Sequence, residues 1–475
     1  MENLISIVVF MLVLFFIGFY TSKKIKDHND WFVAGRDLGL LPLTGSNFAT
    51  AVSTVSILGY LGYYYKMGWA GWWNWAGGIL AFTIGALFFS KRLRSLGKTT
   101  MSEMLEARYG KLHGILASVV IFVAMLFLVS AQLVGSATVV TSVVDVDRRI
   151  VIVFVGVIFI LFTASGGMEA VAWTDTFCSV IIFLGTIALM FSALKEVGGV
   201  CELHRTLAKI RPDALDPWAG GKISVGIAIS WTLTWGIGNY GSPHLVARVN
   251  SAKTPEIASW SQALTTVSFL CFYIPLIFIG LAGMVLYPDI EKADAVAPFM
   301  IQKLLSPWGA GLMMAGVLAA AVSTADSVLL MAGTTFVNDI VLKISNKNYT
   351  PRAILKMSRA ATLLIGIFGM LFSSYTSSGV LWIQANMVGI LGAMLAIVVL
   401  GAFAWRRANS AGALAAMLSG LVTALVWFAL NKPFGLFPIL PGSIVALIVF
   451  IIVSLLTSPP SESVINEFFP QQSRF

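Results

Sequence analysis

The chain has few charged residues for its length. Asp, Glu, Lys and Arg make up 11% of its 475 residues, whereas 58% are hydrophobic. Soluble domains carry roughly 25% charged residues. No polar stretch is long enough to fold as a separate soluble module, so we expect residues 1–475 to form a single membrane domain. The net charge of +9 does not indicate nucleic-acid binding, because the basic residues lie in short groups between apolar runs.

Cysteine and histidine are also scarce. Cys178, Cys201 and Cys271 show no CxxC spacing, and the four histidines are dispersed along the chain. The pattern therefore predicts neither a disulfide framework nor a zinc site. A nucleophile elbow, a zinc-protease motif and a phosphate-binding loop are missing as well. These absences argue against an enzyme.

Long apolar runs are the main feature that is present. A helix of about 20 residues crosses a bilayer, and thirteen runs approach this length. We expect the first to be retained as a helix, because Lys23 and Lys24 follow it and no cleavage site does. The predicted spans are 3–20, 41–65, 71–90, 113–144, 150–164, 168–192, 223–246, 255–287, 308–342, 357–374, 378–403, 409–429 and 434–457.

The distribution of basic residues predicts the orientation. Cytoplasmic loops carry an excess of lysine and arginine, and most of the 31 such residues reach the cytoplasm if the N-terminus is outside. The remainder lie mainly in the long loops 193–222 and 288–307. We therefore expect an inner-membrane protein in a lipid bilayer, with an outside N-terminus and a cytoplasmic C-terminus.

Two spans contain small and polar residues where a lipid-facing helix would carry leucine. Residues 45–56 read GSNFATAVSTVS, and residues 235–244 read WGIGNYGSPH. The clusters lie five spans apart, so their spans run in opposite directions, as in the inverted repeats of transporters with broken helices. Close helix packing through small residues is the alternative. We predict breaks around Ala49 to Ser53 and around Gly236 to Gly241.

Asp175 and Asp326 are the acidic residues that lie well inside apolar spans. A carboxylate at this depth normally faces a cavity or a partner. Ser323, Thr324 and Ser327 are adjacent to one another or one helical turn apart, so their hydroxyls can converge on one face with the Asp326 carboxylate, and hydroxyl and carbonyl oxygens suit a hard cation such as sodium. The alternative is that each hydroxyl bonds to a carbonyl one turn earlier.

Together these residues resemble the sodium:solute symporter family. The likeness covers nearly the whole chain and is strongest at residues 166–176 (GGMEAVAWTDT), 241–248 (GSPHLVAR) and 321–327 (AVSTADS). The resemblance implies an all-α membrane fold of 13 transmembrane helices with a leucine-transporter-type core of five plus five helices. Its parts would be a peripheral helix 3–20, a first repeat 41–192, an inverted second repeat 223–403, two peripheral helices 409–457 and a cytoplasmic tail 458–475.

The resemblance also implies a sodium site between the second and ninth spans. Its ligands would be the backbone carbonyls of Ala49, Val52 and Ala320 and the hydroxyls of Ser323 and Thr324. Asp175, Asp326 and Ser327, with Thr324, would provide a second sodium site or an exit path.

The solute is expected beside the unwound second span. The candidate substrate-binding residues are Ser53, Ser56, Phe127, Gln132, Trp235, Asn239, Trp382 and Gln384. The seventh span is similar to the proline and carboxylate branches of the family, but Ala51 and Asn239 replace an aspartate and a tyrosine of the proline carriers. We therefore expect sodium symport of an amino acid or small carboxylate by alternating access. A sugar or sialic-acid-type symporter, a transporter-like membrane sensor and a passive channel remain as alternatives.

Three further features are interpreted structurally. Arg248 reads as an ordinary basic residue at a cytoplasmic span end, and His244 as a hydrogen-bonded residue at a helix interface. The tryptophans Trp69, Trp72, Trp73 and Trp75 read as interfacial anchors. A monomer would be sufficient for the expected activity, and the oligomeric state is left open.

Overall fold

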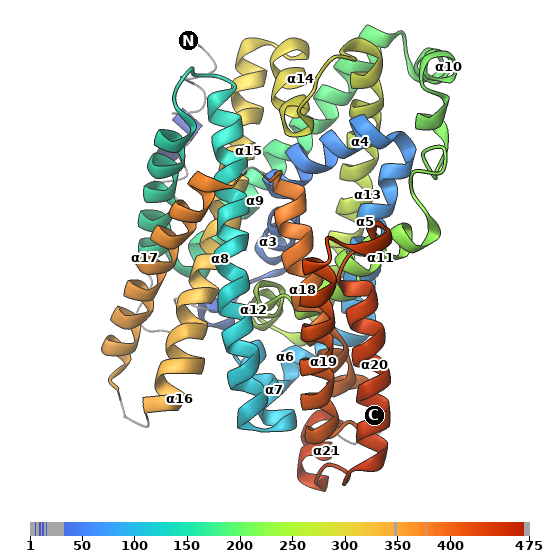
Figure 1. The fold of residues 1–475 in the computed structure, drawn as a ribbon. Coiled ribbons are helices and arrows are strands. Elements are labelled where there is room, and N and C mark those ends of the chain that lie inside the picture. The colour runs from blue at the N-terminus through green and yellow to red at the C-terminus, as the bar shows by residue number, and fades with distance from the viewer. Residues whose placement is uncertain are drawn as a thin grey trace.

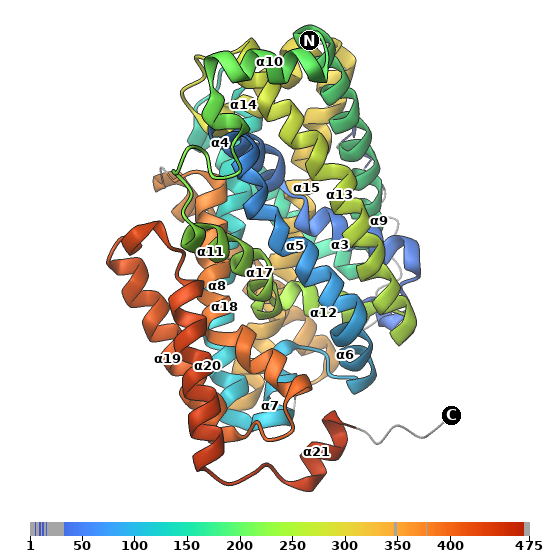
Figure 2. The same cartoon turned by 90° about the vertical axis from the view of Figure 1, so that its right-hand side faces the viewer.

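A computed structural model describes residues 33–345, 349–376 and 378–469, together with residues 5, 9, 10, 12, 13 and 16. These residues form helices and short helical turns, with no strand among them. The helices run mostly along the long axis of the molecule (Figures 1 and 2). The predicted first span, 3–20, lies largely outside the described residues.

Nine helices in the described ranges are long and apolar enough to cross a membrane. The predicted spans 150–164 and 168–192 lie in one continuous helix of 50 residues, so a count of thirteen spans is not confirmed. Glycine residues between the two predicted spans did not end this helix, because a glycine weakens a helix by only about 1 kcal/mol. The longest helices are α8 (Lys111–Thr141), α9 (Arg148–Val197), α13 (Pro255–Leu286), α15 (Pro307–Thr334), α17 (Pro351–Tyr375), α18 (Val380–Ala404), α19 (Ser410–Ala429) and α20 (Ile439–Leu456).

Three of these helices share one kind of start. Thr254, Ser306 and Thr350 precede α13, α15 and α17, and each side chain accepts a hydrogen bond from a backbone N–H of the first turn. A proline occupies the next position in each case. Hydroxyl caps and proline at the first helical position both favour helix initiation, so the sequence fixes where these spans begin.

The predicted second span is broken. Helix α3 (Leu40–Ala51) stops at Val52, whose φ of −100° and ψ of 72° are not helical, and the chain continues as η2 (Val55–Tyr60) and α4 (Leu61–Met67). The residues between α3 and η2 are Val52 to Thr54. The predicted break is therefore confirmed, shifted slightly toward the C-terminal side.

The predicted seventh span is broken as well. Helix α11 (Val225–Trp235) stops at Gly236, with φ −83° and ψ −97°, and is followed by η6 (Ile237–Gly241) and α12 (Pro243–Ser251). Glycine also allows a close approach here. A Cβ atom at Gly77 of α5 (Trp73–Ile84) would lie 2.0 Å from the carbonyl oxygen of Thr232 and 2.7 Å from the nitrogen of Gly236.

Helix α15 lies at the centre of the bundle, and its residues from Met313 to Thr334 are all buried. It packs against α3, α8, α9 and α17, whereas α19 and α20 pair with each other and contact α18. Figure 2 shows α19 and α20 at one side of the bundle.

Short helices mark the two ends. Helices α10 (Val200–Ile210) and α14 (Val296–Leu304) lie at one end, and α7 (Met101–Tyr109) and α21 (Glu462–Phe468) lie at the other (Figure 1). Helix α21 is held there by an ion pair between Glu467 and Lys98, 3.0 Å apart, and by the buried ring of Phe468.

Candidate functional site

Helix α3 packs against α15. Ala49 on α3, Val52 directly after it and Ala320 on α15 are buried. Ser323 and Thr324 follow one turn after Ala320, and their side chains are 2% and 4% exposed. The structure thus places all five residues of the predicted sodium site on these two packed elements.

The hydroxyls of Ser323 and Thr324 have no hydrogen-bond partner among the described residues. Most buried helix hydroxyls bond to a carbonyl one turn earlier, as Ser327 does to Ser323 at 3.0 Å. An unsatisfied buried hydroxyl costs about 1 to 3 kcal/mol. Back-bonding therefore does not account for this pair, and their oxygens are available to a cation.

A buried ion pair lies beside α15 and contacts Ser327, one turn after Ser323. The Arg248 Nη2 atom on α12 is 3.3 Å from Asp175 Oδ2 on α9, and both side chains are fully buried. Ser46 Oγ on α3 donates to the same carboxylate oxygen at 2.5 Å, and Arg248 Nη2 donates to Ser327 Oγ at 2.6 Å. Arg248 Nε also donates to Ser46 Oγ at 2.9 Å. These four residues join α3, α9, α12 and α15, and we call them the Asp175–Arg248 network.

The interpretation of Arg248 as an ordinary cytoplasmic surface residue was wrong. A buried charge must be paired and hydrogen-bonded to be tolerated, and Asp175 and the two serines do this. The basic residue at the end of α12 is therefore an internal cation.

The structure gives the residues of the predicted second sodium site different partners. Asp175 and Ser327 are bonded to Arg248. Asp326 Oδ1 instead accepts a hydrogen bond from Thr163 Oγ1 on α9 at 2.5 Å, and its Oδ2 has no partner among the described residues.

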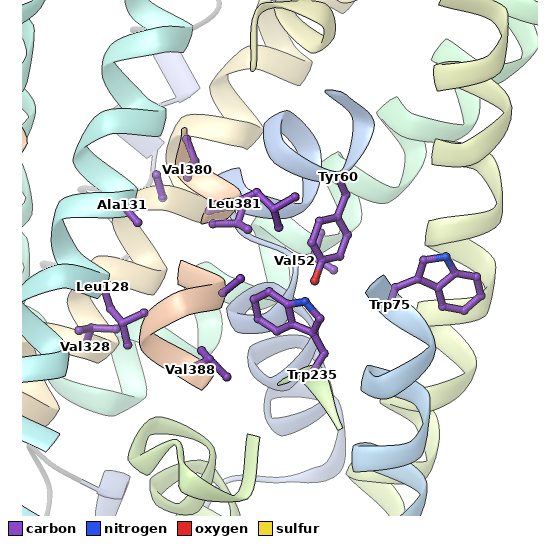
Figure 3. Packing of buried hydrophobic residues seen from close by; sticks show 14 of the residues in the cluster. Val52, Tyr60, Trp75, Leu128, Ala131, Trp235, Val328, Val380, Leu381 and Val388 are labelled. Atoms are coloured by element: carbon purple, nitrogen blue, oxygen red, sulfur yellow. The ribbon is translucent and has the colours of Figure 1, made fainter. Parts of the chain in front are cut away.

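A small cavity of about 30 Å³ lies between the two broken segments, α5, α13 and α18. Figure 3 shows the rings of Tyr60 and Trp235 close together, with Trp75 on the neighbouring helix. Its lining residues are Thr50, Ala51, Tyr60, Trp75, Gly78, Phe82, Trp235, Asn239, His244, Leu245, Phe269, Tyr273, Gln384 and Val388. We call it the central cavity.

Of the predicted substrate residues, Trp235, Asn239 and Gln384 line the central cavity directly. Ser56 Oγ lies 2.9 Å from the hydroxyl of Tyr273 in the wall. Gln132 lies behind the wall, and its Nε2 donates to Gln384 Oε1 at 3.3 Å.

The other predicted substrate residues lie outside the lining. Ser53 Oγ accepts from the backbone nitrogen of Val55 at 3.3 Å within the α3 break. Phe127 packs edge-to-face on Phe372. Trp382 is 43% exposed and stacks on Phe437, with 5.7 Å between the ring centroids.

Sequence reasoning missed several wall residues. Trp75 is 7% exposed and lines the cavity, so its interpretation as an interfacial anchor was wrong. Trp75, Gly78 and Phe82 are spaced three and four residues apart, which puts them on one face of α5, and this spacing could have identified the wall. His244 also lines the cavity, and its Nδ1 has no partner among the described residues, contrary to the expected hydrogen-bonded role.

A second, larger hollow of about 860 Å³ lies at the α14 end. Lys66, Arg148, Lys292, Glu291 and Asp294 supply its charged lining. Asp294 Oδ2 accepts a hydrogen bond from the backbone nitrogen of Val380 at 3.1 Å, at the start of α18. Burial raises the pKa of Asp294, although this hydrogen bond and the cations of Lys66 and Arg148 lower it. Trp382 also lines this hollow.

Comparisons with known proteins agree with this geometry. A family model described as the sodium:solute symporter family matches residues 31–420. The osmoregulated proline transporter of Bacillus subtilis (strain 168) is 26% identical over 480 residues, which cover 97% of this chain and 96% of that protein. The sodium/pantothenate symporter of Escherichia coli (strain K12) is 28% identical over 401 residues, which cover 81% and 82%.

Solved structures show the shared fold. A Na+-coupled sialic acid symporter in a substrate-bound outward-open state superimposes with a TM-score of 0.84 at 21% identity, over 97% of this chain and 98% of that one. A nucleobase-cation-symport-1 family transporter gives a TM-score of 0.61 at 15% identity, over 92% and 97%. The architecture is thus the expected leucine-transporter type.

Proposed function

Because the chain belongs to the sodium:solute symporter family, we propose that it imports an amino acid or a small carboxylate together with sodium. Members of this family are transporters and not enzymes, and sodium-coupled symport of a small solute is the activity of this multi-pass membrane protein. The proposed solute class rests on the likeness of the seventh span to the proline and carboxylate branches. We further propose an inner-membrane location with the N-terminus outside and the C-terminus in the cytoplasm.

The observation that supports the sodium site best is the pair of unpaired hydroxyls on α15. Ser323 and Thr324 present two buried, unpartnered oxygens on α15, and α3, which contacts α15, stops at Val52. The carbonyls of Ala49, Val52 and Ala320 would complete a set of about five oxygens. Such ligands suit a hard cation.

A hydrogen-bonded chain supplies a route for coupling. Thr54, in the α3 break, donates to Gln132 Oε1 at 2.8 Å, and Gln132 Nε2 donates to Gln384 at the cavity. Sodium bound at Ser323 and Thr324 would hold the α3 end in the shape that makes this chain. Sodium and solute would then favour the same conformation, which links their affinities.

The ion gradient provides enough energy. One sodium ion gains about 2.3 kcal/mol from a potential of 100 mV and about 1.4 kcal/mol from a tenfold concentration gradient. Together these support a several-hundred-fold solute gradient. In the alternating-access cycle, release to the cytoplasm would require the Asp175–Arg248 network to part, since it ties α3 and α12 to α9 and α15.

The sodium site is tested by replacing both hydroxyl residues, Ser323→Ala with Thr324→Ala, in reconstituted vesicles. Alanine is a good helix former, so folding should survive. The sodium concentration for half-maximal uptake should rise at least tenfold, about 1.4 kcal/mol, and the affinity for solute should become weak and nearly independent of sodium.

The matched control is Thr265→Ala with Thr266→Ala on α13. These adjacent hydroxyls are bonded to the carbonyls of Ser261 and Gln262, one turn earlier, so sodium half-saturation should not change. An unchanged value in the Ser323 and Thr324 variant would reject the site. Robust sodium-dependent galactose uptake without competition by amino acids or organic acids would reject the proposed solute class.

A further inference from the structure

A second small cavity, also of about 30 Å³, adjoins the central cavity. The two cavities share Phe82, Asn239 and Leu245 in their lining. The second is also lined by residues of η4 (Gly85–Phe89), of α12 and of the start of α6 (Ser90–Leu96). Helix α6 leads to α7, so this cavity lies toward the end of the molecule that carries α7 and α21, which is cytoplasmic in the proposed orientation. We call it the inner cavity.

Four buried aromatic rings connect the inner cavity to α21. Phe89 and Tyr240 both line the cavity, and their ring centroids are 4.8 Å apart. Phe89 also lies 5.1 Å from Phe403 near the end of α18, and Phe403 lies 5.6 Å from Phe468 on α21. The C-terminal helix is therefore in contact, ring by ring, with the residues that close the inner cavity.

Helix α21 covers the junction between α6 and α18. Arg92 Nη1 on α6 donates to the carbonyl of Phe403 at 2.8 Å, and Phe468 packs on the ring of the same Phe403. Figure 2 shows α21 below α6 and α7, and it contacts both. The Glu467 carboxylate pairs at 3.0 Å with Lys98, which lies between α6 and α7. One short helix thus holds α6 and α18 together from outside.

Arg108 on α7 strengthens this docking. Its guanidinium carbon lies 5.5 Å from the ring centroid of Phe468 and 5.7 Å from that of Phe469. A cation over an aromatic face is attracted to the ring, and the attraction grows when water is excluded. The Arg108 side chain is 3% exposed, so α21 is held by a buried cation as well as by its ion pair.

Helix α6 is tied in turn to both broken spans. Arg94 Nε on α6 donates to the carbonyl of Ala252 after α12 at 2.6 Å, and Arg36 Nη2 before α3 donates to the carbonyl of Gly97 after α6 at 2.6 Å. Alternating access moves one group of helices against the other around the binding site. A contact that joins α6, and with it α3 and α12, to α18 must therefore part before this end can open.

From these contacts we propose that α21 is a latch on the cytoplasmic end of the protein. While it is docked, Phe468 and Glu467 hold α6 against α18 and keep the inner cavity closed, and its release lets this end open. The inference rests on the proposed function, because this opening is the inward half of the alternating-access cycle. The Glu467–Lys98 pair is partly exposed and such pairs contribute little, so the buried Phe468 ring supplies most of the hold.

The test measures how fast a small, charged thiol reagent reaches the inner cavity. Ser90→Cys exchanges a lining oxygen for sulfur, in the full-length protein with the exposed Cys201 and Cys271 replaced by serine. The same variants without the added cysteine give the background from buried Cys178. In sodium-free buffer, Phe468→Ala should raise the labelling rate at the added thiol at least threefold. A smaller rise would overturn the latch.

A second position separates a latch from a general loss of packing. Thr138→Cys places a thiol in the hollow at the α14 end, which should not open when the opposite end does. Phe468→Ala should therefore leave labelling of Thr138→Cys unchanged or slower. A rise there as large as at Ser90→Cys would show mere loosening and overturn the inference. The matched control is Asn466→Ala, an exposed position on α21, which should label like wild type at both ends.

Charge reversal at the surface of α21 tests the latch without removing a buried ring. Glu467→Lys places a like charge opposite Lys98, and the repulsion should raise labelling of Ser90→Cys, though by less than Phe468→Ala does. Adding Lys98→Glu restores an attractive pair and should return the rate toward that of wild type. Equal rates in the single and double variants would contradict the role of this contact, and the result does not depend on whether Phe468→Ala folds.

The labelling experiment needs neither sodium nor solute, which separates the latch from the proposed function. An absence of sodium-dependent uptake for every amino acid and small carboxylate tested would reject the proposed function and leave the labelling result standing. Normal sodium-dependent uptake, together with unchanged labelling of Ser90→Cys in Phe468→Ala, would reject the latch alone.

Discussion

Breaking the Asp175–Arg248 pair should strongly destabilise the protein. Both side chains are fully buried, and Arg248 Nη2 lies 3.3 Å from Asp175 Oδ2. The substitution Arg248→Met removes the cation and leaves the carboxylate with Ser46 Oγ as its remaining hydrogen-bond donor in the network. Removing one partner of a buried ion pair typically costs 3 to 5 kcal/mol. We expect a loss of about this size in the free energy of unfolding.

The double variant Asp175→Asn with Arg248→Met should lose less than Arg248→Met alone. Replacing both members of a buried pair by neutral groups is often close to neutral, because the desolvation of both charges is recovered. The interaction energy between the two substitutions should therefore be large, and it should offset part of the summed losses of the two single variants. Equilibrium unfolding of the purified variants in mixed micelles measures it as a double-mutant cycle.

Lys253 provides a matched control, because it is a nearby cation with an exposed partner. It lies 3.1 Å from Asp37, with both side chains more than half exposed, and such pairs contribute about 0 to 1 kcal/mol. Lys253→Met should therefore have little effect. A loss below about 1 kcal/mol for Arg248→Met, or additive losses in the double variant, would refute the reasoning about burial.

Three further predictions concern packing, capping and pH. Gly77→Ala should lower the melting temperature and uptake, because its Cβ would lie 2.0 Å from a carbonyl of α11, whereas Gly39→Ala meets nothing within 4 Å and should be tolerated in the same assays. Thr100→Ala removes the cap of α7, whose Oγ1 accepts from the Glu103 nitrogen at 3.0 Å, and should cost about 1 kcal/mol of unfolding free energy; wild-type stability would rule this out. Hydrogen bonds from Arg211 and Lys222 lower the pKa of Asp213 to about 2, below the ordinary value of about 3.9. The resulting stabilisation is present above pH ~4 and is lost as the pH falls toward 2, so melting curves of Asp213→Asn should show a smaller acid-dependent loss than wild type.

The sequence was sufficient to locate the two helix breaks, because each contains glycine or hydroxyl residues within an otherwise apolar span. It was also sufficient to identify Ser323, Thr324, Asp175 and Asp326 as unusual for membrane depth, since polar groups there require partners. Polar residues inside an apolar span can be recognised from the sequence alone, because hydropathy depends only on the order of residues along the chain.

Tertiary partners could not be derived in the same way. Arg248 stands near the end of a span, where the positive-inside pattern explains a basic residue equally well, and its pairing with Asp175 joins residues 73 positions apart. Trp382 and Trp75 are both tryptophans near span ends. Which of them lines the central cavity depends on the rotation of α5 and α18 about their axes, and sequence hydropathy does not specify that rotation for two helices with apolar residues on all sides.

The two interrupted helices should be visible by amide hydrogen exchange. Amides within α8 or α15 are bonded to carbonyls of their own helix, so exchange with heavy water requires a turn to open. The helical ladder stops at Val52 and again at Gly236, so fewer helical hydrogen bonds protect the amides of the following residues from exchange. Peptides that cover the two breaks should therefore take up deuterium earlier than their neighbours and report, without any added probe, when ions or solute close the backbone around them.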